Sequence, residues 1–588
     1  MNSRETLARP WALSAAVVIT LAIIHSVLTW GYVGWPFGDY GVWLHQVERY
    51  AVGETPYSDF VWTFPPMSLW VIGGAASFLG TDLNAIWGIT VSVYMLIAAA
   101  FCAYLVQLAP TRGSALAAAV IFVAAIPFSS IQSASLPLGM YTPAASVGML
   151  FLLALAATSV KAYQNPKPSS AAICGVLFGC CFLTKQDFWL PALVLLAGVL
   201  YAALRVERPR TAAAAGAGAL GTLLIGGYAL SAQAGISAIP KIFGGYGFVR
   251  TLGVGRMLPT WEGVVTECVT ASVFCGAVCL SLAAANVARR KALRGAFVSI
   301  ASAMVFTAVY WIASRLSGES WPRAAFADSI TQHAFSIFLP EIAAIVLAWR
   351  WKELASDRRR GMLAMLVMTL IAARARRGFE RVETFQVLLE LPVYLLLLEV
   401  LLGAGARRAM LIVAPVLVAW GCYSYWLFES GPLTRSGIKP QVLTMRGPVR
   451  TDPDVNYELV KSALDSLDPS GRIPVVSFGS NGGYAYFLRR TNPLPTTFGI
   501  VQSGLSPEMI VASLKALPQG FLAVFPHLDG DSVPDPRLSV RTWLQPRRLH
   551  PYLELDLPYF VKATKACLTT KTIDRFRHPY YRILDCRQ

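Results

Sequence analysis

Acidic and aromatic residues are concentrated in one early segment of the chain, residues 34–60, which reads GWPFGDYGVWLHQVERYAVGETPYSDF. A carboxylate that is partly removed from water has a raised pKa, which suits it to take a proton from a hydroxyl group as a general base. We therefore take Asp39, at the start of the charged run, as a candidate catalytic base, with helix capping as its structural alternative. Asp59 is a candidate second acid or a partner of Arg49.

The chain also carries cations where a phosphate could bind. Lys185, in the sequence FLTKQDFW, stands at the end of an apolar run. A lysine in the middle of a bilayer costs roughly 2.5–3.5 kcal/mol, so such lysines tend to be paired or functional. Lys185 is therefore a candidate phosphate ligand. The alternative is that its side chain simply extends to the membrane surface.

A second group of cations is the arginine-rich segment ARARRGFERVETF, residues 373–385. The forked donors of arginine match the geometry of phosphate oxygens. The candidate phosphate ligands in this segment are Arg374, Arg377 and Arg381. Pairing of these arginines with Glu380 and Glu383 is the structural alternative.

Metal and redox chemistry have little support in the sequence. His333 has no second metal ligand at a suitable spacing, and the ten cysteines form no C-x-x-C…C-x-x-C pattern. Most of the cysteines lie in or beside apolar runs, where they are most simply core residues. Cys567 and Cys586 alone fall in the polar C-terminal part, and they could pair if that part is extracytoplasmic. We predict no cofactor and no metal site; a divalent metal is compatible with the sequence but is not indicated by it.

The elements that carry these candidate residues are predicted to be transmembrane helices. Of the 588 residues, 55% are hydrophobic and only 14% are charged, against about 25% charged in soluble proteins. The apolar residues recur in long runs, and a helix needs roughly 20 of them to cross the hydrocarbon layer. Such runs are too long for barrel strands, so they must be helices. Thirteen helices are expected, at about 11–30, 84–106, 115–129, 142–160, 170–184, 189–204, 212–231, 264–287, 296–314, 334–349, 361–373, 384–402 and 409–428.

The basic residues indicate how these helices are oriented. With the N-terminus in the cytoplasm, every short loop predicted on the cytoplasmic side is basic, as the positive-inside rule requires. These loops also account for the formal net charge of +17, and we predict no nucleic-acid binding. The odd number of helices then places the C-terminal part outside the cytoplasm.

The first external loop, at about residues 32–83, has structure of its own. Trp43, Val47 and Tyr50 have helical spacing and predict an amphipathic helix over 41–52 lying at the membrane surface. The following segment MSLWVIGGAASFLG is apolar but too short to span a membrane. This loop therefore holds the acidic candidates close to the lipid headgroups.

The composition changes at about residue 440, where turn formers and acidic residues become frequent. DVNYELVKSALDSL and YAYFLRR are typical of helices, and RIPVVSFG and FLAVFP are typical of strands. Alternation of this kind predicts a small α/β domain. We therefore divide the chain into a transmembrane domain, 1–430, and an extracytoplasmic α/β domain, 440–588.

The first loop resembles that of the GT-C glycosyltransferases. The likeness rests on an aspartate that opens the loop, the G-x-x-P-Y segment 53–57, a nearby acid, and Pro65-Pro66 before a short apolar helix. It is closest to the bacterial relatives of the protein O-mannosyltransferases and the lipid A aminoarabinose transferase. Many family members open the loop with Asp-Glu, whereas this chain reads Asp39-Tyr40, which leaves open whether Asp59 takes the second acidic role.

The resemblance implies transfer of a sugar from a polyprenyl-phosphate donor to a lipid or glycan acceptor, at the outer face of the bacterial cytoplasmic membrane. It implies Asp39 as the base and a GT-C-like helical domain, residues 1–430, that holds the lipid. The residues expected to bind substrate are Tyr40, Glu48, Tyr57, Gln186 and His333.

Two other functions are compatible with many helices and intramembrane charges. A transporter or lipid flippase is the main alternative, although the sequence has no internal repeat and no paired helices broken by glycine or proline. A non-catalytic scaffold for polymer assembly is the third, and its external loop would need no acid.

Overall fold

A computed structural model describes most of the first half of the chain and parts of the second. The described residues are 3–28, 30, 39–62, 64–108, 143–244, 343–344, 347–348, 351, 354, 357–375, 388–390, 392–393, 396, 441–450, 457–477, 483–494, 512–527, 568–573 and 580–587.

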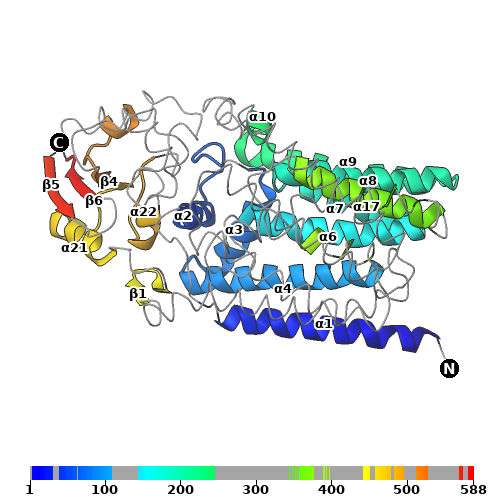
Figure 1. Ribbon diagram of the computed structural model, residues 1–588. Coiled ribbons are helices and arrows are strands. Elements are labelled where there is room, and N and C mark those ends of the chain that lie inside the picture. The colour runs from blue at the N-terminus through cyan, green and yellow to red at the C-terminus, as the bar shows by residue number, and fades with distance from the viewer. Residues whose placement is uncertain are drawn as a thin grey trace, which may run out of the picture.

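Long apolar helices run side by side and form one bundle (Figure 1). They are α1 (Ser3–Leu28), α4 (Leu83–Leu108), α6 (Pro143–Gln164), α7 (Pro168–Phe182), α8 (Trp189–Arg205), α9 (Pro209–Ala234) and α17 (Asp357–Ala375). Among the described residues, four helical segments are long and apolar enough to cross a membrane: Leu83–Leu108, Pro143–Gln164, Gln186–Arg205 and Pro209–Ala234. The chain is an integral membrane protein with several spanning helices.

Most predicted runs in the first half of the chain coincide with these helices. The runs at 115–129, 264–287, 296–314 and 409–428 lie outside the described residues, and those at 334–349 and 384–402 lie largely outside them. The total of thirteen helices therefore stays a prediction.

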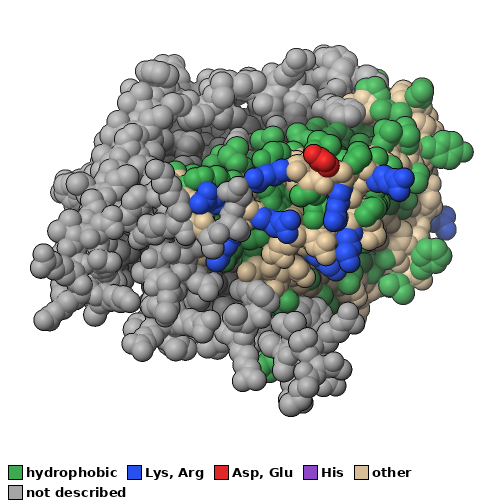
Figure 2. Space-filling model, turned by 90° about the vertical axis from the view of Figure 1, so that its right-hand side faces the viewer, with side chains coloured by type: hydrophobic (Ala, Val, Ile, Leu, Met, Phe, Trp, Pro, Cys, Tyr) green, Lys and Arg blue, Asp and Glu red, His purple; other side chains and the backbone are tan. Residues whose placement is uncertain are grey.

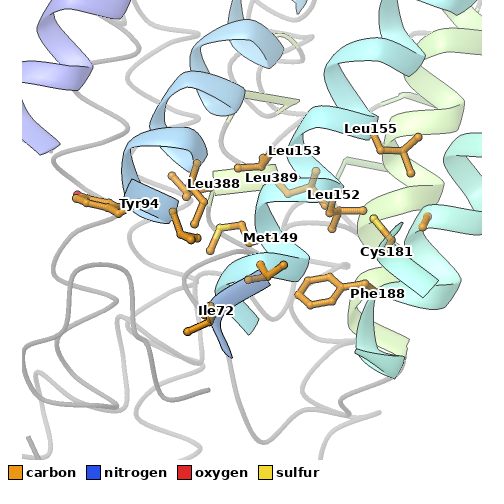
Figure 3. Close-up of a cluster of buried hydrophobic side chains, with 14 of the residues drawn as sticks. Ile72, Tyr94, Met149, Leu152, Leu153, Leu155, Cys181, Phe188, Leu388 and Leu389 are labelled. Atoms are coloured by element: carbon orange, nitrogen blue, oxygen red, sulfur yellow. The ribbon is translucent and has the colours of Figure 1, made fainter. Parts of the chain in front are cut away.

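Helix α6 lies in the middle of the bundle, and nearly its whole circumference is buried. On one side its leucines and Met149 meet Tyr94 of α4 and Ile72, and on the other they meet Cys181 and Phe188 (Figure 3). Phe188 packs so closely on Gly148 that a Cβ there would lie 2.0 Å from the ring. An apolar helix without a polar face is typical of the interior of a membrane bundle.

Helices α7 and α9 approach each other through small residues. A Cβ at Gly175 would lie 2.0 Å from the carbonyl oxygen of Ala215, and one at Gly218 would lie 2.4 Å from that of Ala172. In lipid there is little hydrophobic drive for helices to associate, so close backbone packing of this kind holds them together.

Two short helices lie between the bundle and the C-terminal strands (Figure 1). Helix α2 (Asp39–Ala51) buries Trp43 and Val47, as its sequence spacing predicts, and is amphipathic. Helix α3 (Met67–Leu79) has 13 residues, or about 20 Å at 1.5 Å per residue, and is too short to span. Tyr50 of α2 packs on Gly73 of α3.

The described residues of the C-terminal part form a hairpin, a sheet and short helices. Strands β1 (Gln441–Thr444) and β2 (Gly447–Arg450) form the hairpin. Strands β3 (Val475–Ser477), β4 (Leu522–His527), β5 (Leu568–Ile573) and β6 (Tyr580–Asp585) form a sheet of order β3-β4-β6-β5, in which only the β3–β4 pair is parallel. Helices α21 (Tyr457–Leu467) and α22 (Gly483–Phe487) complete it. The strands predicted at RIPVVSFG and FLAVFP and both predicted helices are confirmed.

Lysine and arginine side chains gather at the end of the bundle farthest from these strands (Figure 2). The α6–α7 turn, the α8–α9 turn and the start of α17 meet there, because Arg208 donates to the carbonyl oxygen of Pro166 (2.6 Å) and Arg358 to that of Gln164 (3.1 Å). We call this the basic end. Its described cations are Lys161, Lys167, Arg205, Arg208, Arg210, Arg358, Arg359 and Arg360. The described loops among those predicted to be cytoplasmic thus lie at one end of the bundle, and the predicted loops at about 109–114, 288–295 and 403–408 lie outside the described residues.

Candidate functional site

The candidate site lies at the other end of the bundle, where the first external loop meets the break between α7 and α8. Helix α2 begins at Asp39, and the side chains of Asp39 and Tyr40 lie outside the described part of the structure. The helix is anchored by its aromatic face. Trp43 stacks on Phe64 with 5.7 Å between ring centroids and meets Trp62 edge-on at 5.0 Å.

Asp59 lies in the turn that follows α2, where its carboxylate accepts a hydrogen bond from the backbone N–H of Thr55 (2.7 Å). The side chain of Arg49 donates to the carboxylate of Glu54 (2.5 Å) and to the main-chain oxygen of Asp59 (2.9 Å). The carboxylate partner of Arg49 is thus Glu54. Asp59 is exposed and caps a turn, so its carboxylate is open to solvent.

Tyr57 is buried beneath the same turn and has a positive φ of 66°. Its hydroxyl donates to the main-chain oxygen of Phe64. Burial raises the pKa of this hydroxyl well above its usual range. The ammonium of Lys241, in α10 (Ala238–Gly244), donates to the main-chain oxygen of Tyr57 (2.6 Å). The main chain of the turn is therefore held in place by a side-chain hydrogen bond from a helix far along the chain.

Lys185 lies directly against the first external loop. The backbone N–H of Met67 donates to the main-chain oxygen of Leu183 (2.8 Å), which joins the loop to the end of α7. The ammonium of Lys185 lies 2.9 Å from Oδ2 of Asp187 and 5.5 Å from the centre of the Phe64 ring. Lys185 and Asp187 are each only 8% exposed. A cation and a carboxylate are thus buried as a pair beside the acid-bearing loop.

Gln186 follows in the 3-10 helix Gln186–Phe188 and is buried. Its Nε2 donates to the main-chain oxygen of Ile242 (3.0 Å), whereas Oε1 makes no hydrogen bond within the described structure. A buried acceptor without a donor is costly. It therefore fits a role in accepting a hydrogen bond from a bound hydroxyl group.

The carboxylate of Glu48 faces the C-terminal hairpin, where it pairs with Arg446. Its other oxygen lies 3.5 Å from Nδ1 of His45, and neither ring nitrogen of His45 makes a hydrogen bond to the described part of the chain. Burial and the charge of Arg49 lower the pKa of His45 to about 3, although Glu54 opposes this, and Arg446 adds a smaller lowering effect. The imidazole is therefore neutral at pH 7, and the contact with Glu48 is not an ion pair.

The structure brings together some of the predicted residues and leaves others undescribed. It places Glu48, Tyr57, Asp59, Lys185 and Gln186 at one end of the bundle. Arg374 lies in the last turn of α17, with its side chain outside the description, and His333, Arg377 and Arg381 lie outside the described residues altogether. Their roles stay predictions, as do the catalytic roles of Asp39 and Asp59, the phosphate-binding role of Lys185, and the substrate-binding roles of Tyr40, Glu48, Tyr57 and Gln186.

Sequence reasoning missed two residues of this site. Asp187 stands two positions from Lys185, and the Lys-x-Asp spacing at the end of an apolar run was a signal for the pair. Arg446 had no comparable signal, because its partner Glu48 lies almost 400 residues earlier in the chain.

No protein-family model and no curated protein matches the chain. Similar solved structures include ArnT from Cupriavidus metallidurans bound to undecaprenyl phosphate, with 15% identity, 97% of each chain covered and a TM-score of 0.40. ArnT in the apo state has 16% identity, the same coverage and a TM-score of 0.41. The Archaeoglobus fulgidus oligosaccharyltransferase, in complex with Zn and sulfate, has 12% identity over 97% of this chain and 72% of that chain, with a TM-score of 0.41. ArnT and the oligosaccharyltransferase are both GT-C superfamily members. At these scores we draw nothing about the site or its substrates from the likeness.

Proposed function

We propose that this chain is a membrane glycosyltransferase that moves a sugar from a polyprenyl-phosphate donor to a lipid or glycan acceptor at the outer face of the bacterial cytoplasmic membrane. The observation that carries the proposal is the position of Lys185 over Phe64, beside the loop that begins at Asp39. An acid and a cation, singled out from distant parts of the sequence, belong to the same end of the bundle.

In the proposed reaction the oxygen of an acceptor hydroxyl attacks the anomeric carbon of the donor sugar. The bond between that carbon and the phosphate oxygen breaks, and polyprenyl phosphate leaves with the electron pair. The carboxylate of Asp39 accepts the hydroxyl proton, which is the task of a general base. Asp59, which is exposed on the same loop, is assigned to the acceptor side as a second acid.

Lys185 is assigned to the departing phosphate, where negative charge develops. A cation held in a site with little water stabilises such charge more strongly than one in bulk solvent. Asp187 keeps this lysine paired when no phosphate is bound. Arg374, Arg377 and Arg381 are proposed as further phosphate ligands. Gln186 is proposed to accept a hydrogen bond from a hydroxyl group of the donor sugar.

The sidedness of the reaction follows from the charges. The basic end is proposed as the cytoplasmic face, which puts α2 and the C-terminal strands outside. Cys586 is disulfide-bonded, which agrees with an oxidising compartment. The full set of thirteen helices and the extracytoplasmic α/β domain at 440–588 belong to this proposal.

The test is transfer by the purified full-length chain in lipid nanodiscs, with a panel of polyprenyl-phosphate hexoses and pentoses and with products detected by mass spectrometry. Asp39→Asn should reduce transfer roughly 10²–10⁴-fold, the usual contribution of a general base. Asp59→Asn is the matched control for loss of a loop carboxylate and should have the smaller effect.

Two outcomes would contradict the proposal. Undiminished transfer by folded Asp39→Asn protein would remove the base assignment. Movement of polyprenyl-phosphate sugar across vesicles, with no donor consumed under any condition, would favour the transporter or flippase function.

A further inference from the structure

The C-terminal hairpin meets the transmembrane part at its turn, where the side chain of Arg446 is buried. Strands β1 and β2 are joined by the two-residue turn Met445–Arg446, which Gly447 closes with a φ of +121°. Thr444 fastens this turn, because its hydroxyl donates to the main-chain oxygen of Gly447 (2.7 Å) and accepts from the N–H of Arg446 (3.2 Å). The turn thus presents Arg446 on a rigid tip.

The guanidinium of Arg446 reaches three separate elements. It pairs with Glu48 of α2, donates through Nε to the main-chain oxygen of Tyr486 in α22 (3.1 Å), and lies 4.9 Å from the centre of the Tyr486 ring. Its Nη1 also lies 3.4 Å from the hydroxyl of Thr81 and 3.7 Å from Asp82. The side chain is 9% exposed. An arginine buried this far with several partners is fixed in orientation by its planar fork.

Other contacts across the same boundary support this arrangement. Helix α22 packs on α2, and the hydroxyl of Tyr486 donates to the main-chain oxygen of Thr81 (2.7 Å). Nη1 of Arg49, on α2, donates to the main-chain oxygen of Leu494 (2.8 Å). The C-terminal part is thus bonded to α2 itself as well as to the loop before α4.

We propose that the β1–β2 turn is an integral part of the transfer site, in which Arg446 is a positioning residue that holds α2, and with it Asp39, through Glu48. This inference rests on the proposed function for the role of Asp39. The reason is geometric. Glu48 and Asp39 lie on one short helix, about two and a half turns apart, so a contact that fixes the helix at Glu48 also fixes its first turn. A displacement of about 1 Å at a reacting group can reduce the rate roughly 10²-fold.

A matched control exists on the same boundary. Arg489 also crosses from the C-terminal part, but its partner is Asp82 (2.7 Å), before α4, and its side chain is 48% exposed. Arg489→Ala removes an ion pair between the same two parts of the chain without touching α2. The two variants therefore separate the positioning of α2 from general attachment of the C-terminal part.

The first measurement is hydrogen–deuterium exchange of the full chain in nanodiscs, which needs no substrate. Arg446→Ala and Glu48→Gln should each speed exchange in residues 39–51 roughly tenfold, because the helix loses a buried partner. Arg489→Ala should leave exchange in α2 as in the wild type. Equal effects of Arg446→Ala and Arg489→Ala on α2 would overturn the proposal.

A double-mutant cycle makes the test independent of gross folding. If Arg446 acts through Glu48, the double variant should exchange no faster in α2 than the faster single variant. If Arg446→Ala does not fold, Arg446→Lys replaces it in the same cycle, since it keeps the charge and loses the fork. Additive effects would show that the two residues act separately and would overturn the proposal.

The second measurement is transfer. Arg446→Ala should lower kcat roughly 10–100-fold, with Arg446→Lys recovering part of it, while binding of undecaprenyl phosphate, measured by native mass spectrometry, should stay within about twofold because Lys185 is untouched. A purely structural role would lower kcat and phosphate binding together, which would contradict the positioning role. If the wild-type protein transfers no sugar, the proposed function fails. The double-mutant cycle measured by hydrogen–deuterium exchange still tests whether Arg446 holds α2 through Glu48.

Discussion

The two ends of the helix bundle both carry cations, but they hold them differently. At the basic end the cations are mostly exposed, and Arg208 and Arg358 donate to main-chain oxygens of Pro166 and Gln164. At the site end two cations are buried and paired with carboxylates: Lys185 with Asp187, and Arg446 with Glu48. The same residue types are thus used for opposite physical purposes.

Solvent explains the difference. A cation in water needs no partner, and its interaction with another charge is weak and screened. A cation removed from water needs a partner, but its field on a nearby charge is several times stronger. The basic end can therefore orient the protein in the membrane, whereas the site end can act on a substrate. Three further experiments test this contrast, in order of decreasing effect.

The largest effect is expected from removing one cation at each end. Lys185→Met should lower transfer roughly 10²–10³-fold, because the departing phosphate loses a preorganised cation. It should also lower the free energy of unfolding by roughly 3 kcal/mol, since Asp187 stays buried without this partner. Arg208→Met, at the basic end, should change transfer by less than about twofold.

Initial rates and thermal unfolding of the two purified variants check this prediction. If the Lys185→Arg variant keeps most of the transfer rate, a positive charge alone is needed at this position. If Lys185→Arg loses most of the transfer rate, the compact ammonium group of lysine is needed. Equal rates for Lys185→Met and Arg208→Met would contradict the assignment of the site to Lys185.

A second, smaller effect concerns pH. The pKa of His45 is lowered to about 3 in the folded chain. Between pH 6.5 and pH 3 the unfolded chain therefore binds more protons at this residue than the folded chain does. The free energy of unfolding of α2 should therefore fall by up to about 1.4 kcal/mol per pH unit below 6.5. The charged groups around the imidazole are Glu48, Arg49, Glu54 and Arg446.

Hydrogen–deuterium exchange at pH 7 and pH 5, corrected for the intrinsic exchange rate, measures this loss in residues 39–51. His45→Phe should abolish it, because phenylalanine takes no proton. The α6–α7 turn at the basic end, with its exposed lysines, should not change over this range. An unchanged pH response in His45→Phe would show that another group is responsible.

The smallest effect on transfer is expected from neutralising the basic end. The triple variant Lys167→Gln, Arg208→Gln, Arg210→Gln should leave transfer per correctly inserted molecule within about twofold, but it should increase the fraction inserted the wrong way round. Labelling of Val52→Cys, an exposed position beyond α2, with a membrane-impermeant maleimide measures orientation. A fall in transfer without a change in orientation would show that the two ends are coupled.

Local patterns were sufficient to predict many of the elements. The spacing of Trp43, Val47 and Tyr50 predicted α2, since one face of an amphipathic helix must be buried. The apolar run before Lys185 predicted that this lysine would lie at the end of a helix. In both cases the cause lies within about twenty residues of chain, the length that crosses a bilayer.

The sequence by itself therefore determined the membrane helices that the structure describes, the basic residues at one end of them and the acidic first loop, because burial in lipid and the distribution of charge act on each segment separately. Only the tertiary structure decided which charges meet. Lys185 lies over Phe64, and Arg446 reaches Glu48 from a hairpin almost 400 residues away, and nothing in either segment alone specifies its partner. The candidate acids and cations of the site could be named from the sequence, but their pairing depends on how distant helices pack.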